Sequence, residues 1–209
     1  MVMVKICGLK DPDLVRFCAG EGADWIGFNF VPQSPRYVTP EAAATLLLQV
    51  GAAVPVALLA DPGDAEVDRI AALGFSIIQL HGTETPERLG EVRARTGLEI
   101  WKAVGVASRD DLDRAGDYSE AGRLLVEALP PEGADRRGGH GAVFDWSLLE
   151  GWAAPKPWLL AGGLTPENVA DAIAQTGAAA VDVSSGVERM RGLKDRELVR
   201  AFIRAAKGN

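Results

Sequence analysis

The sequence is poor in the residues that form covalent or metal-based cross-links. Cysteine and histidine each occur only twice in 209 residues. Two cysteines, Cys7 and Cys18, are too few for the disulfide framework of a small secreted protein, which favours a cytoplasmic location. His81 and His140 lie far apart and lack the short spacing of metal-binding pairs. We therefore expect no metal site, and by residue type alone both histidines serve as structural hydrogen-bonding groups.

The sequence also lacks a long apolar run and a surplus of basic residues. A membrane-spanning helix needs about 20 apolar residues in succession, and Met1 leads into a strand-like segment without the features of a signal peptide. The formal net charge of −7 is unlike that of nucleic-acid-binding domains, which are usually basic. The sequence thus predicts neither a membrane nor a nucleic acid as partner. A small anionic ligand remains compatible with this charge, since the field inside a pocket can differ from that of the whole surface.

What the sequence does contain is a regular alternation of short apolar runs and helical segments. We expect strands at residues 3–7, 24–30, 54–60, 76–80, 99–104, 123–126, 158–161 and 180–183. We expect helices at residues 11–21, 39–49, 63–73, 85–96, 108–115, 165–176 and 195–207, and a short one in FDWSLL. Asp11 precedes Pro12 at the first of these helices, and Asp145 can cap the short one.

Eight alternating units predict a closed parallel barrel. Continuous apolar strands separated by helices are typical of a parallel sheet covered by helices. Eight units in about 200 residues match the lower end of the size range of the (β/α)8, or TIM, barrel. A doubly wound open sheet would use fewer units, and the glycine-rich dinucleotide fingerprint is missing after the first strand. No linker divides the chain, so we predict a single α/β TIM-barrel domain over residues 1–209.

In such a barrel the active site lies at the C-terminal ends of the strands. The loops after predicted strands seven and eight, AGGL and SSGVE, combine small residues, hydroxyls and backbone amides, which are the usual elements of a phosphate site. The same glycines are also compatible with tight turns alone. Arg36, after the second strand, offers a planar fork suited to a carboxylate, or is a solvated surface residue.

Acid–base chemistry requires two titratable groups that face one ligand. Cys7 ends the first strand and is either buried filler or a base at the rim. A thiol is a usable base only if its pKa falls toward neutrality, which a nearby positive charge can achieve. Lys5 precedes Cys7 by two residues and so faces the same side. Glu127 and Asp182 supply carboxyl groups on strands six and eight, with Lys102 as a neighbour.

Seven segments of the chain, taken in order, resemble the phosphoribosylanthranilate isomerase family: VKICGLK, GADWIGFNFVPQSPRYV, IIQLHGTETPE, WKAV, GG-H-G…FDWSLL, LLAGGLTPENV and VDVSSGVE. The resemblance spans nearly the whole chain, and the combination is more specific than any single glycine motif. It implies an Amadori rearrangement of N-(5-phosphoribosyl)anthranilate to 1-(2-carboxyphenylamino)-1-deoxyribulose 5-phosphate, without a cofactor.

The resemblance also implies roles for single residues. Glu127 becomes the general acid that protonates the ribose ring oxygen, and Cys7 the base that removes the C2 proton. Arg36 binds the anthranilate carboxylate, and Asp182 holds a sugar hydroxyl. The remaining residues placed at the substrate are Lys5 and His81, and those at its phosphate are Gly139, Gly141, Gly162, Gly163, Ser184, Ser185 and Gly186.

Three positions depart from the family pattern and keep other functions open. Glu127 stands where aspartate is usual, His140 where serine, threonine or asparagine is usual, and Asn29 where a small apolar residue is common. One alternative is another phosphosugar isomerase, epimerase or aldolase, with Lys5 and Lys102 as the candidate Schiff-base lysines. Another is a diverged barrel that binds a phosphosugar with weak or no catalysis. Monomer and homodimer both remain open, and the polar segment 130–141 fits a mobile lid.

Overall fold

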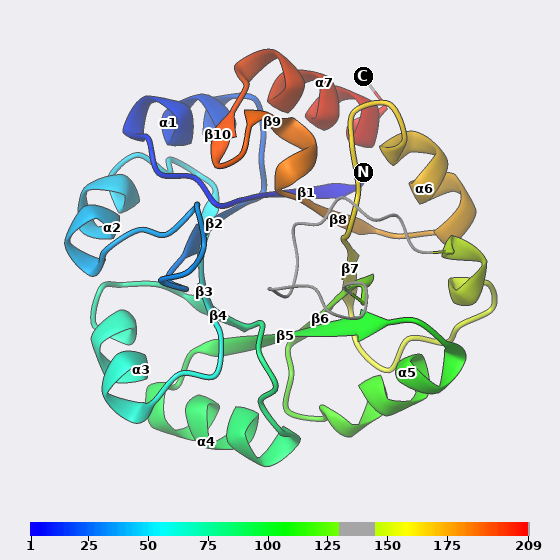
Figure 1. Cartoon of the computed structure of the whole chain (residues 1–209), viewed down its shortest axis with the longest axis horizontal. Helices are drawn as coiled ribbons and strands as arrows, with labels where there is room; N and C mark the ends of the chain where they lie inside the picture. Colours follow the sequence, from blue (N-terminus) through cyan, green and yellow to red (C-terminus); the bar gives the residue numbers. More distant parts are fainter. Residues whose placement is uncertain (130–144, 209) are drawn as a thin grey trace.

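The computed structural model describes residues 1–129 and 145–208, and these form a closed barrel of parallel strands (Figure 1). The eight strands pair in sequence order, and β8 closes the ring on β1. They are β1 (Met3–Cys7), β2 (Trp25–Asn29), β3 (Val54–Leu59), β4 (Ile77–Leu80), β5 (Glu99–Val106), β6 (Arg123–Ala128), β7 (Trp158–Leu160) and β8 (Ala180–Val183). The predicted TIM barrel is confirmed.

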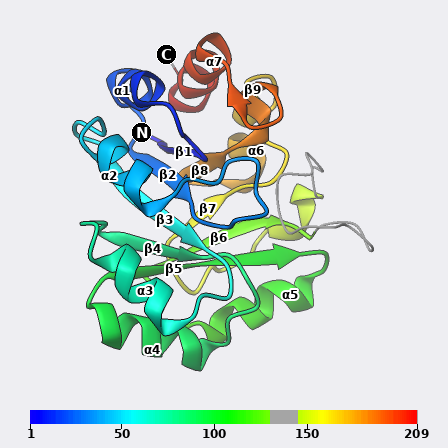
Figure 2. The ribbon, with the colours of Figure 1, turned by 60° about the vertical axis from the view of Figure 1, so that its left-hand side comes forward.

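An outer ring of helices covers the barrel in the two ribbon views (Figures 1 and 2). The α-helices are α1 (Pro12–Gly20), α2 (Pro40–Leu47), α3 (Asp64–Ala71), α4 (Pro86–Thr96), α5 (Arg109–Arg114), α6 (Val169–Thr176) and α7 (Arg196–Lys207). The predicted start of α1 is confirmed, since the Asp11 side chain accepts a hydrogen bond from the amide of Leu14 at 2.8 Å. Across residues 1–129 and 145–208, no helix combines the length and the apolar character required to cross a membrane.

One helix begins later than predicted, and the short helix predicted in FDWSLL, with Asp145 as its cap, is confirmed as a 3-10 helix. α6 begins at Val169 rather than at residue 165, because Asn168 Oδ1 accepts a hydrogen bond from the amide of Thr165 at 2.8 Å and closes a turn there. The FDWSLL segment forms the 3-10 helix η2 (Trp146–Leu149), where the Asp145 side chain accepts from the amide of Ser147 at 2.9 Å. Two further 3-10 helices are η1 (Ala115–Asp117) and η3 (Ser185–Val187).

The interior of the barrel changes from apolar to polar toward the C-terminal ends of the strands. Its lower part is filled by an apolar layer in which Trp25 and Trp101 pack edge to face, 5.1 Å between ring centroids. A smaller cluster of Ala103, Leu125 and Ala161 lies above. On four of the strands, the period of two then places a polar side chain at the next inward position: Lys5 on β1, Gln79 on β4, Glu127 on β6 and Asp182 on β8. These polar positions are where a ligand site is expected.

A short hairpin between β8 and α7 was not predicted. Its strands, β9 (Glu188–Met190) and β10 (Leu193–Lys194), pair antiparallel and lie beside α7 and α1 in Figure 1. Glu188 and Lys194 from this hairpin are buried against the barrel. The hairpin therefore adds charged groups to the C-terminal face.

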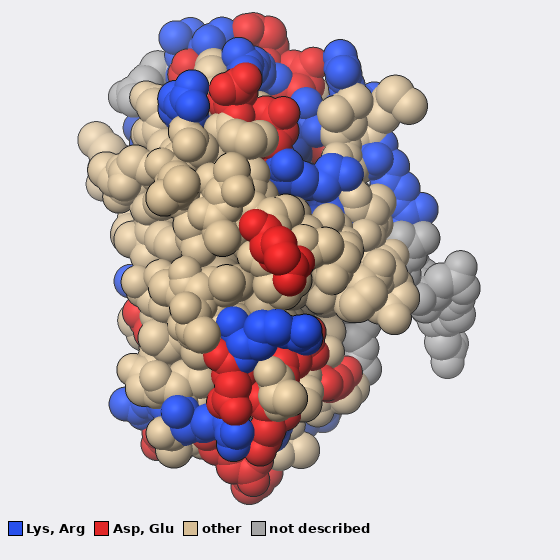
Figure 3. Space-filling model, turned by 90° about the vertical axis from the view of Figure 1, so that its left-hand side faces the viewer, with Lys and Arg blue, Asp and Glu red and all other residues tan. Residues whose placement is uncertain are grey.

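Exposed ion pairs join neighbouring helices on the outside of the molecule. Figure 3 shows blue and red side chains next to one another at the bottom of the view, where α3 meets α4. Arg88 pairs with Asp64 at 2.8 Å, and Arg95 pairs with Asp64 at 2.9 Å and Asp68 at 2.5 Å. Exposed pairs of this kind contribute little to stability. The charged groups at the barrel mouth, in contrast, are buried.

Candidate functional site

Three of the predicted site residues meet on adjacent strands at the centre of the barrel. Lys5 and Asp182 are register partners on β1 and β8, and Lys5 Nζ donates to Asp182 Oδ1 at 2.8 Å. Cys7 lies one inward position above Lys5 on β1. The Lys5 side chain is fully buried, and Asp182 and Cys7 are nearly so. A buried cation thus faces both the carboxylate and the thiol.

The charges of this cluster depend on one another. Burial alone would lower the pKa of Lys5, but the Asp182 carboxylate and the Cys7 sulfur raise it overall, so Lys5 stays an ammonium ion. Burial raises the pKa of the Cys7 thiol, and Asp182 adds to this rise. Lys5, Lys194 and Arg36 act in the opposite direction without reversing it. In the free protein the pKa of Cys7 thus lies above its ordinary value, because burial outweighs the nearby positive charge.

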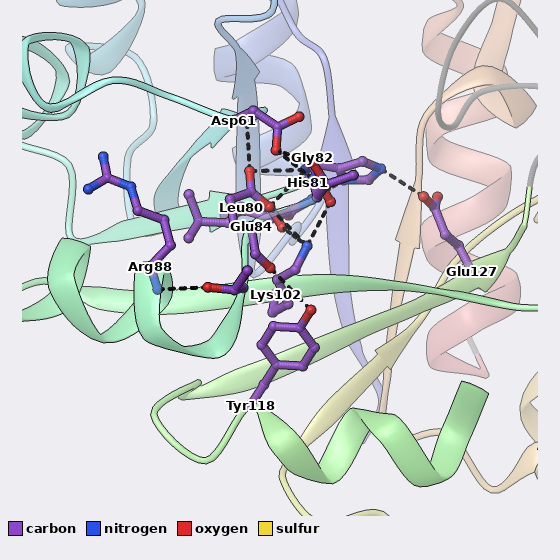
Figure 4. A network of polar contacts seen from close by, with 12 residues as sticks. Asp61, Leu80, His81, Gly82, Glu84, Arg88, Lys102, Tyr118 and Glu127 are labelled. Carbon is purple, nitrogen blue, oxygen red and sulfur yellow. Dashed lines mark hydrogen bonds and ion pairs between the residues drawn. The ribbon is translucent and has the colours of Figure 1, made fainter. Parts of the chain in front are cut away.

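Glu127, the predicted acid, is held by a histidine across the mouth of the barrel. Glu127 Oε1 lies 2.7 Å from His81 Nε2, as the dashed line in Figure 4 marks. His81 Nε2–H donates to the carboxylate, because an ionised carboxyl group can only accept. On the other side of the ring, Nδ1 lies 2.8 Å from the side-chain nitrogen of Gln79. Burial would raise the pKa of Glu127, yet His81, Lys5 and Lys102 lower it below its ordinary value. The resting form of Glu127 is therefore the carboxylate.

The turn that carries His81 is fixed by a buried ion pair. Glu84 accepts hydrogen bonds from the amide of Gly82 at 3.0 and 3.1 Å and from the amide of Asp61 at 2.7 Å. Lys102 Nζ donates to Glu84 at 2.9 Å and to the carbonyl of Gly82 at 3.0 Å (Figure 4). These bonds hold the backbone directly after His81, and so they set the position of the imidazole.

The Lys102 side chain does not point into the barrel. Its neighbours on β5, Trp101 and Ala103, point into the barrel, while Lys102 alternates to the opposite face. There its ammonium is paired with Glu84 and lies 5.6 Å from the ring centroid of Tyr118. Lys102 is still near enough to lower the pKa of Glu127 by its charge, but its amine is paired outside the barrel and does not face the interior as a Schiff-base lysine would.

Arg36 is buried in a second charged cluster at the rim. Its Nε donates to Glu188 Oε1 at 2.6 Å, and its Nη2 to Glu188 Oε2 at 2.9 Å. Lys194 Nζ donates to Glu188 Oε1 at 2.7 Å from the other side. Burial opposes ionisation of Glu188, but Arg36 and Lys194 lower its pKa to about 2. The Arg36 guanidinium is thus buried and fixed by Glu188, and Arg36 is not a solvated surface residue.

The predicted phosphate loops lie next to each other. Gly162 and Gly163 follow β7 with left-handed backbone, at φ 81° and 66°. A Cβ added at Gly186, after β8, would lie 1.8 Å from the carbonyl oxygen of Leu164. The loops after β7 and β8 therefore touch backbone to backbone, which glycine at this position permits. Ser184 and Ser185 lie in the same loop at the entry to η3.

Three of the residues singled out from the sequence lie outside the part of the chain that the structure describes, and one lies on β2. Gly139, His140 and Gly141, with the rest of the polar segment 130–141, lie outside the described residues. Asn29, the departure on β2, uses its side-chain oxygen to accept from the amide of Val31 at 2.8 Å. It therefore stabilises the start of the loop that carries Arg36.

The chain matches known proteins over its full length. A family model described as N-(5'phosphoribosyl)anthranilate (PRA) isomerase matches residues 4–205. The N-(5'-phosphoribosyl)anthranilate isomerase of Hyphomonas neptunium is 68% identical over 209 residues, covering 100% of this chain and 99% of the relative. The chain belongs to this family. The resemblance noted in the sequence is confirmed.

Solved structures agree with the family assignment. The crystal structure of phosphoribosyl anthranilate isomerase from Thermotoga maritima matches with a TM-score of 0.90 and 37% identity, covering 100% of both chains. A crystal structure of a phosphoribosyl anthranilate isomerase in complex with reduced 1-(o-carboxyphenylamino)-1-deoxyribulose 5-phosphate matches with a TM-score of 0.87 and 34% identity, again covering 100% of both chains. That protein binds its ligand on the same kind of barrel.

Four buried polar residues around the barrel mouth were not singled out from the sequence: Gln79, Glu84, Glu188 and Lys194. Gln79 carried a usable signal, since it stands at an inward position of an otherwise apolar strand. The other three lie in loops or in the hairpin, where no periodicity marks a side chain as buried. Only the pairing of Glu188 with Arg36 joins distant parts of the chain, 152 residues apart.

Replacing Lys102 with methionine should lower the free energy of unfolding by about 3–5 kcal/mol, because Glu84 then keeps a buried charge without its cation. Urea unfolding followed by circular dichroism measures this loss. Arg93→Met is the matched control, since it breaks an exposed pair with Glu120 and should cost less than about 1 kcal/mol. Equal losses in the two variants would contradict the role assigned to Lys102.

The ion pairs of Glu188 should make stability depend on pH in a defined direction. Its folded-state pKa of about 2 lies below the ordinary value of 4.5, so the carboxylate stabilises the fold above pH 4.5 and loses this effect as the pH falls toward 2. The unfolding free energy of the unaltered chain should exceed that of Glu188→Gln by up to about 3 kcal/mol at pH 6, and the gap should shrink in acid. Glu120→Gln, in an exposed pair, is the control that should show no such trend.

Proposed function

We propose that this chain catalyses the isomerisation of N-(5'-phosphoribosyl)anthranilate to 1-(2-carboxyphenylamino)-1-deoxyribulose 5-phosphate by general acid–base catalysis. One observation carries the proposal: in a member of this family, a thiol and a carboxylate at the barrel mouth are both influenced by the buried ammonium of Lys5. A carboxylate-binding fork and two phosphate-type loops lie on the same rim. The Cys7 base must be a free thiol, which fits a reducing cytoplasm.

The substrate has three polar parts that correspond to three parts of the rim. Its phosphate would lie against the loops after β7 and β8, where amides and hydroxyls gather. Its anthranilate carboxylate would reach Arg36, whose guanidinium is well suited to a planar anion. Its ribose would then lie between Cys7 and Glu127, with Asp182 as acceptor for a sugar hydroxyl. Asp182 uses Oδ1 for Lys5, which leaves Oδ2 for this bond.

The reaction moves one proton onto the substrate and takes another away. Glu127 donates a proton to the ring oxygen, the bond between C1 and that oxygen breaks, and the lone pair of the substrate nitrogen forms a Schiff base with C1. The Cys7 thiolate then removes the proton on C2, and the electron pair of the C–H bond forms the enolamine. Tautomerisation yields the ketone. No amine of the protein takes part in the Schiff base, and no cofactor is required.

In the free protein Cys7 is a thiol and Glu127 a carboxylate, whereas the mechanism uses the reverse, a thiolate at Cys7 and a protonated carboxyl group at Glu127. The pKa of Cys7 is raised and that of Glu127 is lowered, so the shared proton rests on sulfur. The reactive form carries the proton on the carboxylate instead and has the same total charge. Between the two pKa values, the share of the reactive form therefore does not change with pH.

This reversal predicts a broad pH profile for kcat/KM. Activity should fall in acid only with an apparent pKa below 4.5, and in alkali only with an apparent pKa above 9.0, which are the ordinary values of the two groups. Steady-state kinetics from pH 4 to 10 measure this, with circular dichroism at each pH to confirm the fold. An acid limb near pH 6–7 would contradict the reversal and indicate that a histidine controls the rate.

Substitution of either member of the pair should remove turnover but keep binding. Cys7→Ala and Glu127→Gln should each lower kcat by at least about 10²-fold, while reduced 1-(o-carboxyphenylamino)-1-deoxyribulose 5-phosphate still binds in calorimetry. Glu127→Asp should retain activity, because it keeps the carboxyl group. Cys18→Ala, which removes a thiol on the buried face of α1, is the control and should retain kcat. Full activity in Cys7→Ala would end the assignment of the base.

A further inference from the structure

The guanidinium of Arg36 presents only part of its hydrogen-bonding capacity to the site. Its Nε and Nη2 donate in parallel to the two oxygens of Glu188, at 2.6 and 2.9 Å. Such a bidentate pair fixes the plane of the guanidinium as well as its position. Within residues 1–129 and 145–208, Nη1 has no hydrogen-bond partner. The edge formed by Nη1 and Nη2 is the edge left for a ligand.

The aliphatic part of Arg36 is also held in place. A Cβ added at Gly8 would lie 2.5 Å from Arg36 Cδ, so the stem packs directly on the backbone after β1. Gly8 has φ +79°, a left-handed conformation that favours glycine. The stem and the guanidinium of Arg36 are therefore fixed by different contacts. Only the contact with Glu188 determines which edge faces the site.

Glu188 is itself tied to the phosphate loop and to Cys7. Its carboxylate accepts from Lys194 Nζ at 2.7 Å and from the amide of Gly192 at 2.9 Å. Lys194 Nζ also donates to the carbonyl and the hydroxyl of Ser184, at 3.0 and 3.2 Å. The Ser184 hydroxyl donates to the carbonyl of Cys7 at 3.2 Å. One carboxylate thus connects the Arg36 fork, the loop after β8 and the end of β1.

We propose that Glu188 is a positioning residue that turns the Nη1–Nη2 edge of Arg36 toward the substrate carboxylate and so sets specificity for an aromatic acid. This proposal rests on the proposed function, in which Arg36 binds that carboxylate. Glu188 does not touch the substrate. It acts by orientation, and Lys194 offsets its negative charge so that the cluster of Arg36, Glu188 and Lys194 keeps a net charge of +1 toward the ligand.

Orientation and simple charge make opposite predictions for this residue. If only charge mattered, removal of the Glu188 carboxylate would leave Arg36 and Lys194 more positive and would tighten binding of an anion. If orientation dominates, its removal frees the guanidinium to rotate, and the bidentate contact with the substrate carboxylate is lost. The effect should be confined to ligands that carry the carboxylate.

The test measures binding of two ligands by calorimetry: reduced 1-(o-carboxyphenylamino)-1-deoxyribulose 5-phosphate, and the same compound without its carboxyl group. Glu188→Ala should weaken binding of the first by about 10-fold or more, equivalent to about 1.4 kcal/mol, and change binding of the second less than twofold. Glu188→Gln, whose amide oxygen still accepts one bond, should lie between and serves if the alanine variant does not fold. In an Arg36→Lys background, Glu188→Gln should have no further effect on the carboxylate-bearing ligand.

The outcomes separate the two proposals. An equal loss for both ligands, tighter binding of the carboxylate-bearing ligand, or no change in either would overturn the positioning role of Glu188. If the unaltered chain prefers the carboxylate-bearing ligand and Arg36→Lys removes that preference, the proposed function stands whatever Glu188 does. If the unaltered chain binds both ligands equally or neither, the proposed function fails, and the role of Glu188 fails with it.

Discussion

The buried ammonium of Lys5 is the charge on which the rest of the site depends. An unpaired cation in a barrel interior is strongly disfavoured, so Lys5 must be accompanied by negative groups, and its contact with Asp182 at 2.8 Å supplies one. The charge of Lys5 favours the ionised forms of both Cys7 and Glu127 and so opposes the effect of burial. At Glu127 the pKa falls below its ordinary value, whereas at Cys7 burial still dominates and the pKa stays raised. The proposed acid, base and sugar-binding carboxylate are thereby coupled through a single group on β1.

Other buried ion pairs repeat this principle at the loops around the mouth. Lys102 with Glu84 holds the turn after β4, and Glu188 with its two cations holds the loop after β8. Each pair loses hydration when it is buried, and such pairs are often no more stabilising than apolar residues. Their value here is geometric, because a site works only when its contacts are held within a fraction of an ångström. Beyond the ends of the barrel strands, these ion pairs hold the loops in place.

The sequence predicts the barrel strands and the residues inside the barrel mouth well. It predicts poorly the side-chain contacts that hold the surrounding loops. The alternation of apolar runs and helices identifies the eight strands, and a period of two places Lys5 beneath Cys7 on one face. The start of α6 was missed because the Asn168 side chain closes a turn there, and no propensity reveals such a bond. Glu188 lies 152 residues from Arg36, so their pairing is decided by closure of the barrel, not by any local pattern. The balance between burial and charge at Cys7 likewise requires the folded surroundings.

The contact between His81 and Glu127 is compatible with both protonation states of the carboxyl group. His81 Nε2–H donates to Oε1, and it can do so whether the carboxyl group is ionised or protonated, because Oε1 is an acceptor in both forms. The proton can then be carried on Oε2, without any change in the contact that positions the side chain. A substrate with phosphate and carboxylate groups brings negative charge into the mouth and excludes water from it, and both effects raise the pKa of Glu127. Binding of the substrate therefore favours the protonated acid, although the free protein holds Glu127 as a carboxylate.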